Sequence, residues 1–594
     1  MKRKLLKLLP VAAVLLTASC TDDKYDLSDI DTQSRFTAKG LVVPLNMDKI
    51  KLDAMISIDD ESEIKKDEQG NYYFQKESKS PFKSDDVNVE KITITKPADI
   101  HQSVTVAITL DPTIQGKWET YAAGKTIAEI KADATLMSQV GLTNEMDIIN
   151  VNVSDSKPFN LSATGIDTRI TKLDKLGIDP LTLNIDVKLN GLQAVVDGVS
   201  VTGLSIGLPC GMTVGNITDG GSYNATGMMS FPTMVINGQK KISATVSELT
   251  YSAMAADGAN FDANAHTFTY NKLCTVAGSA TIKLKDLKGS ATLAEIKNVV
   301  AATYSCDVKF ANNLVVNNFS GGINYTIDDI EIDPVKIENL PELLEGSGTS
   351  IEIANPQLYL DVNNPFFDNN ITAKAGIRIK GNKTFPDKLL TFDEKDNKQV
   401  LSPENKDLVE QGYKWVVFSE LKELLTGDQI PQTLDIKVVN PVLNADNVTN
   451  FTLGENHDGI TGNWKFFAKL ALTDNSKIVY TKTWDDWGSD DLNGLTVEKA
   501  VVTFTVSKDV ALDAESISFT LMGAIGKELT GTTKLLGDAE QEISIPMEGG
   551  PLKNIKGGKL TVHLKGKNQG LNKEQQIEVS NLRLKVDGFY DKEF

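Results

Sequence analysis

Alternation of apolar and polar side chains with a period of two residues is the feature that most constrains this fold. The clearest run has Leu181, Leu183, Ile185, Val187 and Leu189 at every second position, followed by the turn pair Asn190-Gly191. Alternation of this kind predicts a strand with one buried face. Similar runs recur along the chain, at 87–94, 104–110, 242–246, 280–284 and 323–327. Gly, Asn and Asp separate them, so the sequence predicts an all-β fold of tandem β-sandwich domains, immunoglobulin-like or related, with a few short helices.

Local signals add a few specific elements. Residues 67–71 are turn-forming and predict a hairpin. A helix is expected over Thr126–Val140, and Ser402-Pro403-Glu404 is typical of a helix start. A second short helix is expected over Ser419–Leu425, closed by Gly427. At the C-terminus the alternation changes phase at Ser580-Asn581, which predicts a β-bulge.

An internal repeat is indicated in the second half of the sequence. Two segments, 342–358 and 423–443, each read as a helical turn, a strand and an Asn-Pro pair. Proline donates no hydrogen bond to a sheet, so each pair is expected at a strand end, a bulge or an edge. Two such units suggest duplicated sandwich domains. The expected segments are a leader (1–19), a tether (20–34), β domains (35–190 and 191–333) and two repeat units (334–431 and 432–594).

The strands followed by Asn355-Pro356 and Asn364-Pro365 also carry a resemblance. They are similar to the late-embryogenesis-abundant sandwich family. That resemblance implies a lipid-binding envelope protein as one alternative function.

The N-terminus has the features of a secretory leader. Lys2, Arg3, Lys4 and Lys7 precede an apolar run that is too short to span a membrane as a helix. Thr17-Ala18-Ser19 then precedes Cys20. This resembles the lipobox of bacterial lipoproteins, although Thr17 replaces the usual leucine, and implies that Cys20 carries lipid and anchors the chain in the outer membrane. The alternative is an ordinary secreted protein.

An acidic segment follows Cys20. Its composition predicts a solvated tether. Residues 24–32 resemble the start of surface lipoproteins of Bacteroides-type bacteria (Bacteroidota). Their sequence is Lys24-Tyr25-Asp26-Leu27-Ser28-Asp29-Ile30-Asp31-Thr32. The resemblance implies an address on the outer face of the outer membrane. A periplasm-facing lipoprotein is the alternative.

Charge and cysteine content argue against nucleic-acid binding and against a structural zinc site. The formal charge is −19, and removal of the leader with its four positive groups leaves about −23. A chain this acidic, without a Lys/Arg cluster, is not expected to bind nucleic acid. Cys210, Cys274 and Cys306 have no Cys-x-x-Cys spacing, so no structural zinc is expected, and any disulfide pairing stays open. We expect Cys306 to be a buried core thiol, because it alternates with apolar residues.

Motifs for catalysis are weak. Gly203-Leu204-Ser205-Ile206-Gly207 matches a nucleophile elbow, but Pro209 follows where a helix must start, so we interpret it as strand and turn. The four histidines (His101, His266, His457 and His563) are far apart in the sequence. We therefore expect a non-enzymatic protein without a metal or cofactor. A glycoside hydrolase with two carboxylates stays an alternative, because 80 acidic residues offer many pairs.

One stretch is a candidate binding site. Trp484, Asp485, Asp486 and Trp487 follow one another closely in a polar loop, and flat rings beside carboxylates suit the faces and hydroxyls of sugars. The competing interpretation is that both rings fold back onto the sandwich. The expected function is binding of an extracellular ligand, glycan first. A structural or adhesive envelope component that contacts envelope proteins is the next alternative.

Overall fold

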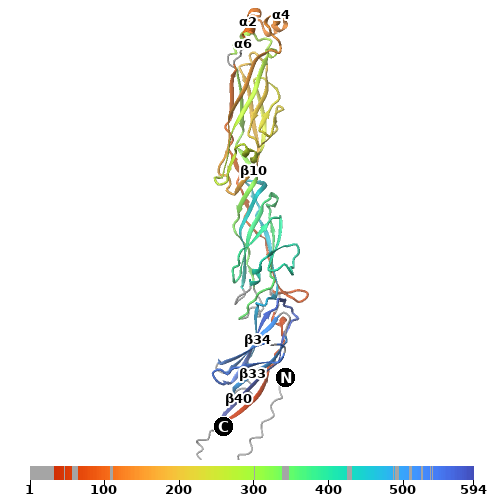
Figure 1. Cartoon of the computed structure of the whole chain (residues 1–594), viewed down its shortest axis with the longest axis vertical. Helices are drawn as coiled ribbons and strands as arrows, with labels where there is room; N and C mark the ends of the chain where they lie inside the picture. Colours follow the sequence, from red (N-terminus) through yellow and green to blue (C-terminus); the bar gives the residue numbers. More distant parts are fainter. Residues whose placement is uncertain are drawn as a thin grey trace, which may run out of the picture.

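A computed structural model shows an elongated molecule in which three β-sandwich bodies follow one another along one axis (Figure 1). It describes residues 33–593 except 46, 48, 57–63, 107–110, 300–301, 338–346, 425–430, 486, 488–493, 508–511, 524–525, 536 and 538. We call the bodies distal, middle and basal. The predicted all-β fold of sandwiches with short helices is confirmed.

A twelve-stranded sheet runs through both the distal and the middle body. Its main path is β12 (Met212–Gly215), β16 (Gln239–Thr250), β10 (Ile170–Asn190), β20 (Leu314–Thr326), β28 (Thr433–Thr452), β24 (Thr372–Lys380) and β25 (Lys388–Phe392). The strands off this path are β7 (Ile92–Ile94), β8 (Ile100–Val106), β19 (Ala302–Phe310), β21 (Ile330–Glu331) and β22 (Val335–Lys336). Strand β20 pairs with β10 of the distal body and with β28 of the middle body, so it connects the two.

The distal body is closed by a seven-stranded sheet. Its strands are β13 (Ser222–Tyr223), β14 (Met228–Ser230), β11 (Val199–Gly207), β18 (Thr267–Lys283), β17 (Asn260–Asp262), β15 (Met234–Ile236) and β9 (Asp147–Ala163). Phe159 of β9 and Phe310 of β19 meet edge to face across the two sheets, with ring centroids 5.9 Å apart. The two inner faces therefore share one core.

Short helices lie mainly at the far end of the distal body, where Figure 1 shows α2, α4 and α6. The helices are α1 (Leu52–Met55), α2 (Pro112–Tyr121), α3 (Ile127–Ala132), α4 (Ala134–Val140), α5 (Tyr251–Ala256) and α6 (Leu293–Lys297). Short 3₁₀ turns are η2 (Leu284–Asp286), η3 (Phe367–Asn369) and η4 (Ser419–Glu423). We call α2, α3, α4 and α6 the distal cap.

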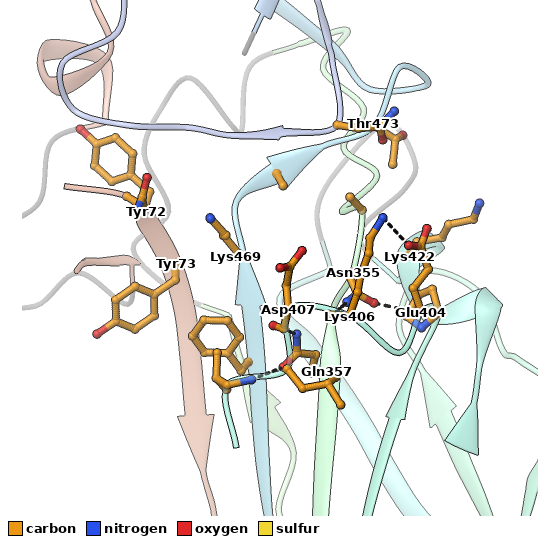
Figure 2. Close-up of a pocket in the computed structure, with 18 of the residues that line it drawn as sticks. Tyr72, Tyr73, Asn355, Gln357, Glu404, Lys406, Asp407, Lys422, Lys469 and Thr473 are labelled. Atoms are coloured by element: carbon orange, nitrogen blue, oxygen red, sulfur yellow. Dashed lines mark hydrogen bonds and ion pairs between the residues drawn. The ribbon is translucent and has the colours of Figure 1, made fainter. Parts of the chain in front are cut away.

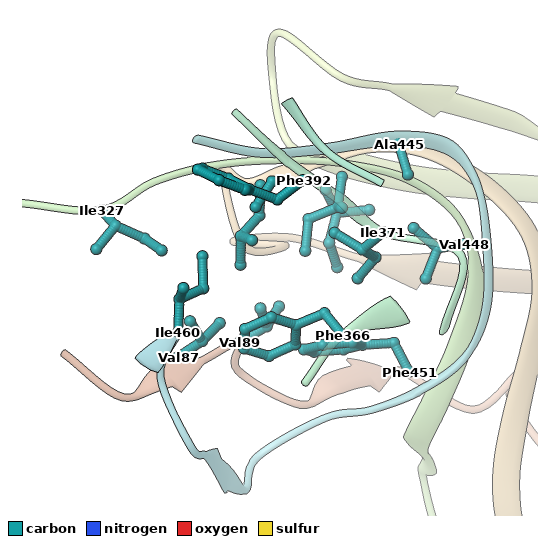
Figure 3. Packing of buried hydrophobic residues seen from close by; sticks show 14 of the residues in the cluster. Val87, Val89, Ile327, Phe366, Ile371, Phe392, Ala445, Val448, Phe451 and Ile460 are labelled. Carbon is teal, nitrogen blue, oxygen red and sulfur yellow. The ribbon is translucent and has the colours of Figure 1, made fainter. Parts of the chain in front are cut away.

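The middle body places a second seven-stranded sheet against the end of the twelve-stranded one. Its strands are β27 (Lys414–Val417), β26 (Asp396–Ser402), β23 (Gln357–Asn363), β30 (Thr461–Lys469), β4 (Tyr72–Glu77), β3 (Ile64–Lys66) and β5 (Phe82–Lys83). A small ribbon joins β6 (Val87–Asn88) to β29 (Asn456–His457). Figure 3 shows the apolar packing here, in which Phe366 and Phe451 lie together beneath Ile371 and Val448.

The basal body contains both ends of the described chain. One sheet holds β1 (Gln33–Pro44), β40 (Gln576–Glu593), β33 (Leu495–Ser507), β36 (Gln541–Ile545), β2 (Ile50–Lys51) and β37 (Leu552–Lys553). The other holds β32 (Lys477–Trp484), β38 (Ile555–Gly566), β34 (Leu512–Gly523) and β35 (Glu528–Lys534), and β31 (Ala471–Leu472) pairs with β39 (Gln569–Gly570). The first strand, β1, pairs antiparallel with the last, β40, from Gln33↔Glu593 to Pro44↔Arg583.

The expected segment boundaries do not follow these bodies. Residues 35–190 and 191–333 contribute to the same sheets, because β10 pairs with β16, and β9 pairs with β18. Asn355-Pro356 precedes β23 and Asn440-Pro441 lies within β28, so the two pairs belong to facing sheets of one body. They do not mark two copies of a domain. Their positions do match the expected strand end and bulge, since Asn440 has φ +49° beside a register shift.

Several local predictions are confirmed. Residues 67–71 form the turn between β3 and β4, where the Asp67 amide donates to the Asn71 carbonyl at 3.0 Å. The alternating run 181–189 lies in β10. A register shift between Thr503 and Thr505 of β33 faces Asn581 (φ +53°), which is the predicted C-terminal bulge.

Three helix predictions need correction. The helix expected over Thr126–Val140 is two helices, because the extended residue Asp133 ends α3 and its carboxylate caps α4 by accepting from the amides of Thr135 and Leu136. Ser402 ends β26 and starts no helix; its hydroxyl donates to the Glu404 carbonyl. The short helix is the 3₁₀ turn Ser419–Glu423, and Leu425 and Gly427 lie outside the described residues.

Candidate functional site

A pocket of about 970 Å3 opens on the middle body, close to its junction with the basal body (Figure 2). Strands β4, β23 and β30 supply its floor, and the loop 403–409 supplies one wall. Asn568, which follows β38, reaches it from the basal body. Most of the lining is polar or charged, and the pocket brings together residues that are distant in the sequence.

Two aromatic rings form part of the floor. Tyr73 of β4 and Phe467 of β30 stack with ring centroids 5.4 Å apart and planes 26° apart. Their neighbours Tyr72, Phe74 and Phe466 are buried, so strand alternation turns Tyr73 and Phe467 to the opposite, outer face. Both rings are half-buried and present apolar surface to the pocket.

Side chains at alternate positions of β23 and of the residues just before it hold the loop 403–409 in place. Asn355, Gln357 and Tyr359 share one face, as residues at i, i+2 and i+4 of an extended segment do. Their hydrogen bonds to the loop run from Asn355 Nδ2 to the Lys406 carbonyl (2.7 Å), from Gln357 Nε2 to the Asp407 carbonyl (2.9 Å) and from the Val409 amide to the Tyr359 hydroxyl (2.9 Å). These side chains satisfy backbone groups of a loop that belongs to no strand of the described chain.

Tyr359 is the most buried of these three side chains. Its hydroxyl donates to Gln357 Oε1 at 2.5 Å and also accepts from the Glu410 amide at 3.2 Å. Burial raises the pKa of Tyr359, and the amides that it accepts from oppose this effect. The hydroxyl therefore stays protonated and keeps its donor at neutral pH.

Charges of both signs line the pocket in equal number. They are the carboxylates Asp67, Glu404 and Asp407 and the lysines Lys406, Lys422 and Lys469. Lys406 forms an ion pair with Glu404, and Lys422 lies 3.8 Å from the buried Glu352. Such a lining offers hydrogen-bond donors and acceptors to an uncharged polar ligand without a strong preference for either charge.

A second, smaller hollow of about 340 Å3 lies further along the same sheet face. It is lined by Tyr359, Asp361, Tyr413 and Asn463, among others. Rings of Tyr359 and Tyr413 meet edge to face at 4.9 Å. An ion pair between Lys465 Nζ and Glu410 Oε1 (2.5 Å) lies on the side nearer the larger pocket.

The tryptophan loop expected to bind glycan lies elsewhere, in the basal body. The Trp484 and Trp487 rings lie 6.1 and 6.4 Å from the Phe519 ring, Trp487 in a stacked geometry. Both are partly buried against the core, whereas Asp485 is exposed and Asp486 lies outside the described residues. This geometry favours the interpretation in which the two rings pack on the core over one in which they bind a glycan.

Other sequence candidates are spread over the molecule. Cys20 and its tether to residue 32 lie outside the described residues. Cys210, Cys274 and Cys306 are free thiols, and burial raises the pKa of Cys306 to about 12. Gly203 (φ +61°) lies at a register shift within β11, in agreement with the interpretation of this segment as strand and turn.

The histidines are equally scattered. His101 pairs with Asp307 on the distal body, His266 lies in a turn with φ +53°, and His457 packs on Phe451 with centroids 4.4 Å apart. His563 lies on β38 of the basal body. Over the described part of the chain, no three His, Cys, Asp or Glu side chains are grouped to hold a metal ion. No helix there combines the length and apolar character needed to cross a membrane.

Comparisons with known proteins are sparse. No protein-family model matches the chain, and neither does any curated protein. Among solved structures, part of the chain is similar to a protein from Parabacteroides distasonis for which secretion is proposed. The two share 14% identity with a TM-score of 0.30, over 45% of this chain and 88% of that one.

The aromatic floor of the pocket was missed in the sequence. The signal was present, because Tyr73 stands between the buried Tyr72 and Phe74, and Phe467 follows the buried Phe466. Alternation places both rings on an outer face. Only the pairing of β4 with β30 reveals that Tyr73 and Phe467 lie on the same face of one sheet.

Proposed function

We propose that this chain is a non-enzymatic glycan-binding protein of the cell envelope, with its site in the pocket of the middle body. The observation that carries the proposal is the stacked pair Tyr73–Phe467, half-exposed on a floor otherwise rich in polar groups. Aromatic rings pack on the apolar faces of sugars, and convergent amides, carboxylates and lysines bond their hydroxyls. The polar lining supports a glycan over the acyl chain of a lipid.

The test is binding of the soluble chain from Thr21 onward to immobilised polysaccharides. The panel contains neutral linear glucans and mannans together with acidic polymers such as polygalacturonate. We expect at least one polymer to be retained, and the double variant Tyr73→Ala/Phe467→Ala to lose about tenfold or more in affinity, since each stacking contact contributes about 0.5–1.5 kcal/mol.

Two controls separate the candidate sites. Tyr121→Ala removes an exposed tyrosine from α2 of the distal cap and should leave binding unchanged. Trp484→Ala/Trp487→Ala should also retain binding; loss in this variant alone would move the site to the basal loop. Retention of no polymer would remove the glycan proposal, and release of reducing sugars would favour a glycoside hydrolase.

A structural role is the second candidate. It is supported by the elongated shape, in which β1 and β40 lie in the basal body while α2, α4 and α6 lie at the opposite end (Figure 1). In this proposal the chain is an outer-membrane lipoprotein, anchored through Cys20, that faces the exterior and carries the distal cap away from the membrane. Two acyl chains or more give stable anchoring.

Anchoring has its own test. Cys20→Ala should release the protein from the membrane fraction, and proteinase added to intact cells should degrade the wild-type chain. Sedimentation of the variant with membranes would contradict the anchor, and full protection of the wild type would place the chain in the periplasm.

A further inference from the structure

The two hollows of the middle body lie on one continuous strip of the sheet. The register of β4, β30 and β23 puts their outer side chains in rows. In order along the strip, the rows are Tyr73–Lys469, Gln75–Phe467–Gln357, Glu77–Lys465–Tyr359 and Asn463–Asp361. The first two rows line the larger pocket and the last two line the smaller one.

This strip is long and narrow. Lys469 and Asn463 are six residues apart on β30, which corresponds to about 20 Å at 3.3–3.4 Å per residue. Across the strip, the β23 side chains Gln357 and Tyr359 are buried, so the exposed width is that of β4 and β30, which lie about 4.8 Å apart. The loop 403–413 walls one side of the strip along both hollows, through Asp407 and Val409 at the larger and Glu410 and Tyr413 at the smaller.

Each end of the strip offers groups for a polar ligand. The larger pocket has the Tyr73–Phe467 rings and the two signs of charge described above. At the other end, Asn463 is exposed, and its Oδ1 accepts from the Ser78 hydroxyl at 3.2 Å. The Lys465–Glu410 ion pair lies between the two ends, on the path that joins them.

We propose that the two hollows form a single binding track for a linear glycan, which lies along β30 and occupies both hollows at once. This inference rests on the proposed glycan-binding function and specifies its ligand class. A compact or highly branched sugar fills one hollow only. A linear chain gains contacts at both ends, and the second contact forms at the high effective concentration set by the first.

The experiment uses linear fragments of two to eight sugar units, cut from the polysaccharide that the full-length soluble chain retains. Isothermal titration gives the affinity for each length. Affinity should rise with length and then level off once the track is filled. An affinity that is the same for two and eight units would overturn the single track.

Two variants test the ends separately. Tyr73→Ala removes a contact in the larger hollow, and Asn463→Ala removes one in the smaller. Each should weaken the eight-unit fragment about fivefold, as expected for loss of one stacking or hydrogen-bonding contact, whereas a two-unit fragment should respond to only one of them. Tyr121→Ala and Asn152→Ala, at exposed sites of the distal body, are the matched controls.

Failures of the two proposals are distinguishable. If no polysaccharide is retained, the glycan function itself is wrong. If one is retained but Asn463→Ala, with unchanged thermal unfolding, binds the eight-unit fragment as the wild type does, then the ligand occupies the larger hollow alone. In that case the track is wrong and the glycan function stands.

Discussion

Gly558 of β38 makes room for the Trp487 ring. A Cβ at this position of β38 would lie 2.5 Å from Trp487 Cη2 and 2.7 Å from Phe519 Cζ. The missing side chain thus leaves room for the Trp487 ring to stack on Phe519. Trp487, which belongs to a polar stretch of sequence, thus packs against the basal core beside a glycine of β38.

Gly558→Ala should therefore destabilise the basal body by about 1–3 kcal/mol, the usual cost of forcing an extra methyl group into a packed site. Urea unfolding followed by tryptophan fluorescence measures the effect. Gly215→Ala in β12 is a matched control, because a Cβ there meets no atom within 4 Å. Equal midpoints for both variants would show that the rings do not pack on β38.

Asp167 holds a buried charge near the start of β10. Its side chain is only 3% exposed, and it accepts from Arg169 Nε at 2.7 Å and from the Glu90 amide at 3.1 Å. The Arg169 guanidinium also lies over the Tyr325 ring, 4.5 Å from its centroid. Burial by itself raises the pKa of Asp167, but the hydrogen bonds from Arg169 and Glu90 outweigh it and hold this pKa below its usual range.

The sign of the pH effect follows from that lowered pKa. The ionised Asp167 stabilises the folded state above the pKa of the unfolded chain, about 3.9, and this contribution is lost as the pH falls through the lower folded value. We expect the melting temperature to fall more steeply with acid in the wild type than in Asp167→Asn, which lacks the titrating group. Thermal scans between pH 2 and 7 measure the difference, and parallel curves would contradict it.

At the scale of elements, strands with one buried face and the bulge that shifts their phase were predictable, whereas the starts and ends of helices were not. The run 181–189 and the bulge at Ser580-Asn581 follow directly from the period-two pattern, because burial of one face dictates both. The helix over 126–140 was wrong because Asp133 bonds the next helix's amides more favourably than it extends the first. Ser402-Pro403 has the composition of a helix start, yet Ser402 completes β26.

The candidate site could not be predicted from the local sequence pattern, for a different reason. Its floor joins β4 to β30, and its wall joins the loop 403–409 to β23. Contacts between segments so distant in the chain depend on sheet order, which alternation does not encode. The sequence thus indicated the tryptophan loop, where the chemistry is contiguous, and missed Tyr73 and Phe467, where it is assembled by folding.

Strand β1 protects the edge of the basal sheet. It covers one side of β40 over most of its length, and its own side chains are largely exposed. A chain lacking residues 33–44 should therefore lose little apolar burial but expose the backbone donors and acceptors of β40, an edge prone to pairing with other chains. Size-exclusion chromatography should show self-association of the truncated chain, and a monomer as stable as the full chain would contradict this role.

At the scale of the whole molecule, the elongated shape places the distal cap and the basal body at opposite ends. Gly124 lies in the turn between α2 and α3 of the distal cap, and a Cβ added there would meet no atom within 4 Å, so we expect an epitope inserted after it to be tolerated. Under the proposed anchoring through Cys20, an antibody added to intact cells should label this epitope more strongly than one inserted after Gly550 in the basal body. Equal labelling at both positions would argue against an orientation in which the cap points away from the membrane.

The pairing of β1 with β40 also sets an order of events during biogenesis. Residue 33 is synthesised long before its partner Glu593, so the basal sheet cannot close until almost the whole chain has been made. The distal sandwich draws its described strands from residues 92–326 and can be complete long before. The distal end can therefore fold while the base is still open, and β1 waits for its partner strand until residues 583–593 have been made.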